Sequence, residues 1–413
     1  MPSAPSRGKL YLTLLAAFLG WMFDGMEMGI FPIVARPALE GMARGLQGGE
    51  LKNFVDGWMG WATALFLWGA ALGGLVFGWL GDKIGRVRAM SLSILCYSLF
   101  TGLAYFATEP WHLAASRFVA ALGMGGEWSL GVALVMEIWP EKRRPMLAAV
   151  IGAASNVGFA LIAVIAIVFP VTKESWRWVM LVGAAPAVLT FFIRLFVPES
   201  ERWRAAAEGR HTHPLREIFR APLLRRTLLA IVLSSVVLIV TWGAVQWLAL
   251  VGQDRAGSAD PRAKGVTQAV SSLGAIFGCL LGAWLGRFGR RAAYFALCVL
   301  ALGVTTYLFR FTRFYDVEFF IFVLLAGVFT GAFYGWLPLY LPELFPTRVR
   351  ATAQGLSYNL GRILAGFGAL QMGALVHKLG GYERAGATIV LVYFVGMVTI
   401  WFAPETRGKP LPE

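Results

Sequence analysis

The same pattern of residues occurs twice in this chain, about half its length apart. The run GWLGDKIGR at 78–86 returns as GAWLGRFGR at 282–290, an offset of 204. Two shorter patterns, a Glu-x2-Pro-x3-Arg spacing and a Pro-Glu-Ser or Pro-Glu-Thr triplet, return at an offset of 206; their positions are 137–144 and 343–350, and 198–200 and 404–406. The offset is about half of 413 residues. We therefore expect two copies of one unit, joined head to tail, with a period too long for a solenoid.

The chain is rich in long apolar segments. Hydrophobic residues make up 58% of it and charged residues 15%, whereas charged residues are about a quarter of soluble domains. About twelve segments are long enough to cross a bilayer as helices. They are 10–33, 57–80, 89–107, 110–136, 146–170, 176–196, 227–251, 266–286, 291–309, 317–342, 351–376 and 385–403. We predict an all-α membrane protein of two pseudosymmetric six-helix bundles, an organisation typical of transporters.

The longest polar stretch separates the two copies. It covers residues 197–226 and contains three prolines and many arginines. We predict an N-terminal bundle over 1–196, a cytoplasmic linker over 197–226 that can include a surface helix, and a C-terminal bundle over 227–413.

The positive charge is distributed unevenly over the predicted loops. The net charge is +14, and with the N-terminus in the cytoplasm 22 of the 37 Lys and Arg residues fall on the inner side and 12 on the outer. This bias favours both termini inside. The basic residues then face anionic lipid headgroups, and nucleic acid is not an expected partner. We predict a multi-pass protein of a bacterial inner or plasma membrane.

Two acidic residues lie within the first predicted helix. Asp24 and Glu27 are three residues apart and share a helix face. Counted from Tyr11, Asp24 lies about 20 Å along the helix, beyond the bilayer midplane. Two partly desolvated carboxylates this close repel each other, which makes the pair a candidate proton carrier. The alternative is that one of them forms a salt bridge with an arginine.

The fourth predicted helix carries one charge of each sign. Arg117 and Glu127 are ten residues apart, about 15 Å along the helix, so they cannot pair with each other. A charge at this depth is costly and usually functional. We expect Glu127 to face the central cavity as a third proton-carrying candidate. Asp24 or Glu27 is a sensible partner for Arg117, and its release would let Arg117 bind an anion.

Arg362 is the sharpest candidate for substrate binding. It lies about ten residues into the eleventh helix, near the midplane, with no carboxylate close to it in the same half. A guanidinium can hold a carboxylate through two parallel hydrogen bonds. The alternative is a pair with Asp24, Glu27 or Glu127. Three more polar or aromatic residues are candidates for the same cavity, namely Gln246, Asn359 and Tyr358.

The repeated loop resembles a known signature. Gly-x3-Asp-Lys-x-Gly-Arg after the second segment, its degenerate copy after the eighth, and the run RFVAALGMG at 117–125 are similar to sequences of the major facilitator superfamily. The resemblance implies that Asp82, Arg86, Glu137 and Arg144 latch the inner side in the outward-facing state. The second copy has Gly286 where the first has Asp82, so Glu343 must rely on Arg287, Arg290 or Arg350, in a weaker latch. Gly78 and Gly85 belong to the same loop.

Two branches of the superfamily are resembled. DGME in the first helix and GGEW in the fourth resemble proton-linked organic-acid symporters, whereas PESERW is shared with sugar porters. The resemblance implies proton-coupled uptake of a small organic anion by alternating access. A sugar or polyol porter and a proton-coupled exporter are the alternatives. An enzyme is not expected, because no nucleophile–base pair, phosphate loop or metal-ligand spacing occurs. No metal or cofactor and a monomer are expected.

Overall fold

The protein is built of helices in the computed structural model, which describes residues 7–169, 171–207, 213–257, 262–379 and 381–412. The helices of the first half are α1 (Arg7–Met42), α2 (Gly48–Ile84), α3 (Arg86–Leu103), α4 (Pro110–Ile138), α5 (Arg144–Val168), α6 (Trp176–Val182) and α7 (Ala187–Phe196). Two short helices follow, α8 (Glu201–Ala207) and α9 (Pro214–Ile218). The second half contains α10 (Leu223–Gly243), α11 (Leu248–Ala256), α12 (Ala263–Gly286), α13 (Arg290–Arg310), α14 (Val317–Leu344), α15 (Arg350–Asn359), α16 (Gly361–Leu379), α17 (Tyr382–Ile389) and α18 (Tyr393–Thr399).

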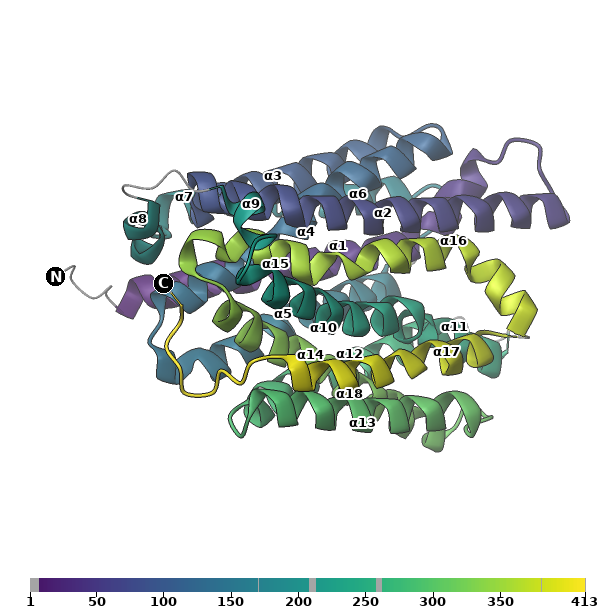
Figure 1. Ribbon diagram of the computed structural model, residues 1–413. Helices are drawn as coiled ribbons and strands as arrows, with labels where there is room; N and C mark the ends of the chain where they lie inside the picture. Colours follow the sequence, from purple (N-terminus) through teal and green to yellow (C-terminus); the bar gives the residue numbers. More distant parts are fainter. Residues whose placement is uncertain (1–6, 170, 208–212, 258–261, 380, 413) are drawn as a thin grey trace.

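The long helices run side by side along one axis, and both termini lie at the same end of the molecule (Figure 1). Among the described residues, ten helices are long and apolar enough to cross a membrane. The predicted sixth and eleventh segments are not among these ten, and each consists of two helices. The sixth consists of α6 and α7, and the eleventh of α15 and α16, with Leu360 between them.

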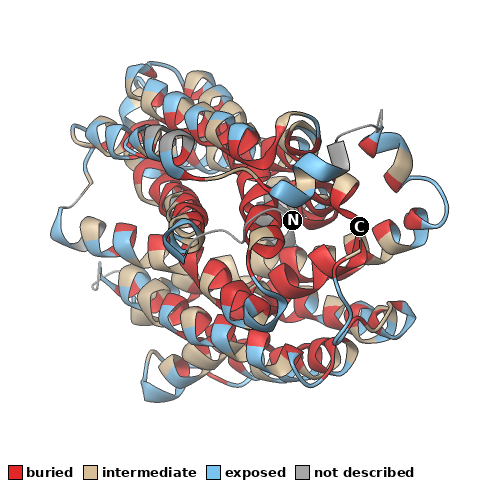
Figure 2. Ribbon diagram, turned by 90° about the vertical axis from the view of Figure 1, so that its left-hand side faces the viewer, coloured by how far each residue is buried: buried red, intermediate tan, exposed pale blue. Residues whose placement is uncertain are grey.

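The two copies form separate groups of helices that meet along a central interface. Within the first, α2 packs on α4 and α1 packs on α5; within the second, α12 packs on α14 and α10 packs on α15 and α16. Contacts between the halves are made by α2 against α15 and α16, and by α5 against α12 and α14. Viewed along the axis, buried residues gather where the helices face one another, and exposed residues lie outside (Figure 2).

Glycines allow the helices to approach closely. A Cβ atom on Gly125 of α4 would lie 1.9 Å from the carbonyl oxygen of Ala70 on α2, and one on Gly282 of α12 would lie 1.8 Å from that of Ala332 on α14. No other residue fits at such contacts, which bring backbones together as in other membrane helix pairs. The four-residue glycine spacing in the sequence predicts a close approach of this kind.

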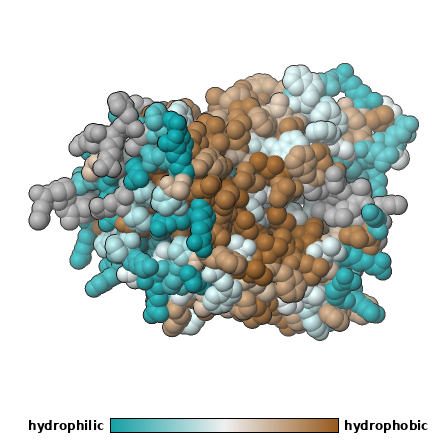
Figure 3. Space-filling model, viewed as in Figure 1, coloured by the Kyte–Doolittle hydropathy of each residue, from teal (hydrophilic) through white to brown (hydrophobic). Residues whose placement is uncertain are grey.

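The outer surface carries an apolar band between two hydrophilic ends (Figure 3). Large apolar side chains such as Leu99, Val164, Phe277 and Val398 are exposed. Such a band suits the hydrocarbon core of a bilayer. The segment between the halves is attached to the end that carries the termini, since the indole nitrogen of Trp203 in α8 donates to the Asp82 carbonyl at 2.9 Å. The domain boundaries at 196/197 and 226/227 stay a prediction.

Candidate functional site

Five charged side chains are buried at the centre of the molecule. Asp24 and Glu27 come from α1, Arg117 and Glu127 from α4, and Arg362 from α16, and none is more than 4% exposed. Charged groups this deep are expensive and mark pathways for ions or substrates. The fold thus brings together the residues that the sequence singled out within the apolar segments. The structure gives the contacts of these five residues, and their roles stay a prediction.

Arg117 has a protein partner. Its Nη1 atom donates to Oε1 of Glu27, which also accepts from Thr101 at 3.1 Å. The guanidinium lies between the rings of Phe31 and Phe66, with its Cζ atom 4.7 and 4.5 Å from their centroids. These contacts satisfy the expectation that Arg117 pairs with a carboxylate of the first helix. The Glu27 carboxylate balances the charge of Arg117, although the Arg117 Nε atom is buried without an acceptor, so Arg117 is a poorer candidate for substrate binding than the sequence suggests.

Asp24 faces Glu127 more closely than it faces Glu27. The carboxyl groups of Asp24 and Glu127 are within hydrogen-bonding range of each other. A Cβ atom on Gly20 would lie 1.8 Å from Oε1 of Glu127, so the Glu127 carboxyl rests on the bare backbone of α1, one turn from Asp24. Neither carboxyl accepts a hydrogen bond from another described group. Glu127 is therefore a nearer neighbour of the Asp24 carboxyl than Glu27 is, and the roles of Asp24, Glu27 and Glu127 as proton carriers stay a prediction.

Arg362 has no ion-pair partner among the described residues. No carboxylate of the described residues lies within 4.0 Å of its guanidinium, although Asp24 feels its charge. Its Nη1 atom donates to Oδ1 of Asn359 at 2.7 Å, its Nε atom is buried without an acceptor, and its Cζ atom lies 5.6 Å from the Tyr358 ring centroid. The alternative of a direct salt bridge to Asp24, Glu27 or Glu127 is wrong for this conformation.

Asn359 has no N–H donor left for a ligand acceptor. Its Nδ2 atom donates to the carbonyls of Gly125 at 2.8 Å and Gly355 at 3.0 Å, and its Oδ1 atom accepts from Arg362. Asn359 therefore joins α4 of one half to Arg362 of the other. The expectation of direct substrate contact is less suited to these bonds than a role in orienting the guanidinium.

Gln246 lies outside the regular part of α10. It belongs to a short 3₁₀ turn, Val245–Trp247, beyond the end of that helix. The sequence pattern does not reveal the break after Gly243. The role of Gln246 in substrate binding stays a prediction.

Uncharged polar atoms at the centre also lack partners, and sequence reasoning missed them. Gln354 and Ser357 of α15 are fully buried, and neither side chain has a hydrogen bond. The indole nitrogens of Trp21 and Trp128 are likewise buried without an acceptor. Both indoles surround Tyr358, with ring centroids 6.4 and 3.8 Å from its own. The sequence signal for this site is the glutamine within an apolar helix. Uncharged polar residues are too common in such helices for this glutamine to stand out.

At the end that carries the termini, Asp82 joins the two halves. Its carboxylate accepts from Nη1 of Arg86 at 2.8 Å and, across the interface, from the backbone nitrogens of Ala351 at 3.2 Å and Thr352 at 2.8 Å. Asp82 thus caps the first turn of α15 in the other half, where the helix dipole favours a negative charge. Gly78 lies one turn earlier and lets α15 approach, since its Cβ would lie 2.6 Å from the Ala351 carbonyl oxygen.

Glu137 holds a second bond between the halves. Its Oε1 atom accepts from Arg86 at 3.1 Å and from Arg350 of the other half at 2.9 Å. Arg144, the partner that the sequence suggested, instead lies 3.1 Å from Glu141. Arg350 of the second half reaches Glu137 because the repeated loops of the two halves face each other, an arrangement that sequence spacing within one copy cannot reveal.

The second copy reproduces the arrangement within its own half. Arg290 pairs with Glu343 through two bonds of 2.7 and 2.9 Å, as Arg86 pairs with Glu137. A counterpart of the Asp82 cap is missing, since Gly286 has no carboxylate. Arg144 interacts electrostatically with Glu343, but the two side chains form no ion pair. The sequence predicts this difference between the copies, because Gly286 stands where the first copy has Asp82. That the ion pairs of the second copy form a weaker latch stays a prediction.

Near its end, each copy also has a glutamate that caps a helix. Glu199 accepts from the backbone nitrogens of Arg86 and Val87, and Glu405 from those of Arg290 and Arg291. Burial raises the pKa of Glu199 despite these donors, whereas in Glu405 the donors outweigh a lesser burial and lower the pKa. Gly85 has φ of 107° and leaves the space that the Glu199 carboxylate fills.

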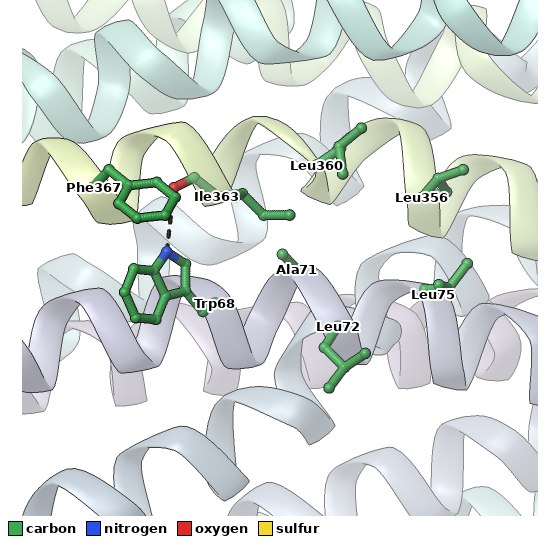
Figure 4. Close-up of a pocket in the computed structure, with 8 residues that line it drawn as sticks. All are labelled: Trp68, Ala71, Leu72, Leu75, Leu356, Leu360, Ile363 and Phe367. Atoms are coloured by element: carbon green, nitrogen blue, oxygen red, sulfur yellow. Dashed lines mark hydrogen bonds between the residues drawn. The ribbon is translucent and has the colours of Figure 1, made fainter.

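An apolar groove lies at the side of the molecule between α2 and the α15–α16 segment (Figure 4). Its volume is about 320 Å³, and it is lined by Trp68, Ala71, Leu72, Leu75, Leu356, Leu360, Ile363 and Phe367. The Trp68 indole donates to the Ile363 carbonyl at 3.2 Å, across the two halves. None of the charged central residues lines this groove, so it is distinct from the central cluster.

The sequence profile described as the Major Facilitator Superfamily matches residues 13–287 and 259–413. These matches cover nearly the whole chain, including both copies of the loop. The chain belongs to the major facilitator superfamily. It is accordingly a multi-pass membrane protein and a transporter of metabolites, not an enzyme.

Curated relatives extend over almost the full length. A Haemophilus influenzae protein with only a general assignment to metabolite transport is 31% identical, over 96% of this chain and 97% of its own. The gentisate transporter of Corynebacterium glutamicum is 28% identical, over 85% of this chain and 78% of its own. The sialic acid transporter NanX of Escherichia coli is 26% identical, over 96% and 94%.

The fold is similar to that of solved superfamily members. The proton:xylose symporter XylE, in a structure with 6-bromo-6-deoxy-D-glucose, matches with a TM-score of 0.79 and 16% identity, over 98% of both chains. At this identity the likeness concerns the fold alone. The predicted fold class, an all-α membrane protein with the major facilitator fold, is confirmed.

Proposed function

We propose that this transporter takes up a small organic anion together with a proton, and that Arg362 binds the carboxylate. The observation that carries the proposal is the buried guanidinium of Arg362, which has an unpaired Nε donor and no carboxylate partner within 4.0 Å among the described residues. A buried charge normally has a counter-ion. A carboxylate substrate supplies one.

The acidic pair supports proton coupling. With one proton shared between Asp24 and Glu127, the pair carries one negative charge, which Arg362 balances. An arriving carboxylate adds a second negative charge. A second proton on the acidic pair restores neutrality, and a neutral centre is cheap to move between the two sides of a membrane. One proton then accompanies each monovalent anion.

The relatives favour the same substrate class. The molecules in the names of the gentisate and sialic acid transporters are an aromatic acid and a sugar acid. Their shared group is a carboxylate. This matches the property that Arg362 is suited to recognise, and it leaves the rest of the substrate undefined.

Uptake into proteoliposomes tests the proposal. Labelled monocarboxylates, gentisate and sialic acid among them, are supplied outside at acidic pH with an alkaline interior, and the accumulated label is measured. We expect Arg362→Gln to lower uptake of the transported acid by about tenfold to a hundredfold, the value of one or two charged hydrogen bonds.

Arg313→Gln is the matched control, because Arg313 is an exposed arginine of the same half. Arg362→Lys retains the charge and loses the paired donors, so it should fall between wild type and Arg362→Gln. Equal uptake by the Arg362→Gln and Arg313→Gln proteins would show that Arg362 does not bind the anion.

A further inference from the structure

Among the described residues, four buried polar side chains close to Tyr358 in space or along the chain have no hydrogen-bond partner. They are Trp21 on α1, Trp128 on α4, and Ser357 and Gln354 on α15. Each is at most 3% exposed, and the amide of Gln354 is fully buried with neither its oxygen nor its nitrogen bonded. Buried polar atoms without partners are rare in native proteins and require an explanation. Four such side chains close together suggest that one explanation applies to all of them.

All four groups are neighbours of Tyr358. Gln354 is three residues before Ser357 and four before Tyr358, so its side chain lies beside both on the surface of α15. The Trp128 ring stacks on Tyr358 at 3.8 Å, the Trp21 ring meets it edge-on at 6.4 Å, and the Arg362 guanidinium lies 5.6 Å from it. Tyr358 is thus the shared neighbour of the guanidinium and of the indoles.

Donors outnumber acceptors in this group. Each indole supplies one N–H, the glutamine amide two, and the serine hydroxyl one, whereas only the amide and hydroxyl oxygens accept. The complementary ligand atom is an oxygen or another acceptor. A second full charge there would lack the counter-ion that Arg362 provides for the first, so an uncharged carbonyl or hydroxyl oxygen fits best.

We propose that Trp21, Trp128, Ser357 and Gln354 form an uncharged subsite that binds an oxygen at the far end of a carboxylate substrate held by Arg362. The substrate class is then a monocarboxylic acid about one ring long that bears a distal carbonyl or hydroxyl. This inference rests on the proposed function and deepens it. Because the subsite includes residues of both halves, a bound substrate would bridge them.

Two acids that differ only at the far end test the subsite. Dissociation constants of cyclohexanecarboxylate and 4-oxocyclohexanecarboxylate are measured by calorimetry on the purified full-length protein in nanodiscs. We expect wild type to bind the oxo acid about tenfold more tightly or better, since unpaired donors strongly favour a ligand that satisfies them. In Gln354→Met and Trp128→Phe, which keep the shape and remove donors, this preference should fall towards one.

Control variants come from the same chain. Gln268→Met and Trp401→Phe change a glutamine and an exposed tryptophan elsewhere, and should keep the wild-type preference. An unchanged preference in both Gln354→Met and Trp128→Phe would overturn the subsite, as would its absence in wild type. The Arg362→Gln variant separates the two proposals. It should bind both acids more weakly than wild type does. If its affinity for both acids equals that of wild type, the proposed function is wrong. Binding of neither acid to wild type contradicts both proposals.

Thermal unfolding without ligand gives an independent measurement. Replacing an unpaired buried amide by an apolar group of similar shape is neutral or stabilising. Gln354→Met should therefore keep or raise the melting temperature. Gln268→Met should lower it, because the Gln268 amide donates to Ser272 at 3.2 Å. A clear fall for Gln354→Met would show that the amide has a structural partner and would overturn the subsite.

Discussion

Arg117 and Glu27 show how the partner of a buried charge decides its role. Each is the ion-pair partner of the other, and removing one leaves an uncompensated charge. We expect Glu27→Gln and Arg117→Gln each to lower the free energy of unfolding by about 3 kcal/mol. The double variant should be more stable than either single variant, because no charge is then left alone. Thermal and denaturant unfolding in detergent measure these differences.

Asp24→Asn is the control for this pair. Asp24 lies three residues from Glu27 on the same helix, but it has no arginine within 4.0 Å among the described residues. Its substitution removes a carboxyl without stranding a cation, so the stability should hold or rise. A double variant as unstable as the sum of the two single variants would mean that the Arg117–Glu27 pair contributes no coupling energy.

At the scale of elements, the Asp82 carboxylate accepts hydrogen bonds from the first turn of α15 and so connects α2 to the other half. Asp82→Ala removes this cap and the contact with Arg86 together. We expect the end that carries the termini to open more often. A cysteine in place of Thr347, which is 3% exposed, should then react with a soluble maleimide about tenfold faster, above the background of the native cysteines.

Asp316 supplies the matched control for the cap. Its Oδ1 atom accepts from the backbone nitrogen of Phe319 at 3.0 Å, at the start of its own helix α14. Asp316→Ala costs about 1 kcal/mol of stability as a lost cap. It breaks no bond between the halves, so labelling at position 347 should stay at the wild-type rate. Faster labelling in both variants would attribute the effect to general instability.

The sequence predicts elements better than it predicts their contacts. Apolar length located the membrane segments, and the repeat located the two clusters of ion pairs at the end that carries the termini, because hydrophobicity and duplication are properties of the chain itself. The sequence does not predict the breaks at Leu360 and after Gly243. The pair of Asp24 with Glu127 and that of Glu137 with Arg350 depend on how helices pack, which spacing along one helix does not determine.

For the whole molecule, the balance of charge at the centre predicts how transport responds to the membrane potential. If one proton accompanies each monovalent anion, the loaded carrier and the empty carrier are both neutral. Accumulation should then follow the pH gradient and be insensitive to a potassium diffusion potential set with valinomycin. Accumulation that rises with a negative interior at constant pH would require more than one proton for each anion.

The double variant Asp24→Asn, Glu127→Gln separates movement from coupling. Without either carboxyl the empty centre carries the positive charge of Arg362, which is costly to move through the membrane, whereas the loaded centre is neutral. We therefore expect exchange of labelled for unlabelled acid to continue while accumulation driven by the pH gradient is lost. Each single variant keeps one titratable carboxyl and should retain accumulation, with an altered dependence on pH because two coupled groups have become one. If gradient-driven accumulation survives in the double variant, the proton is carried elsewhere, and Glu27 is the remaining carboxylate among the central charges.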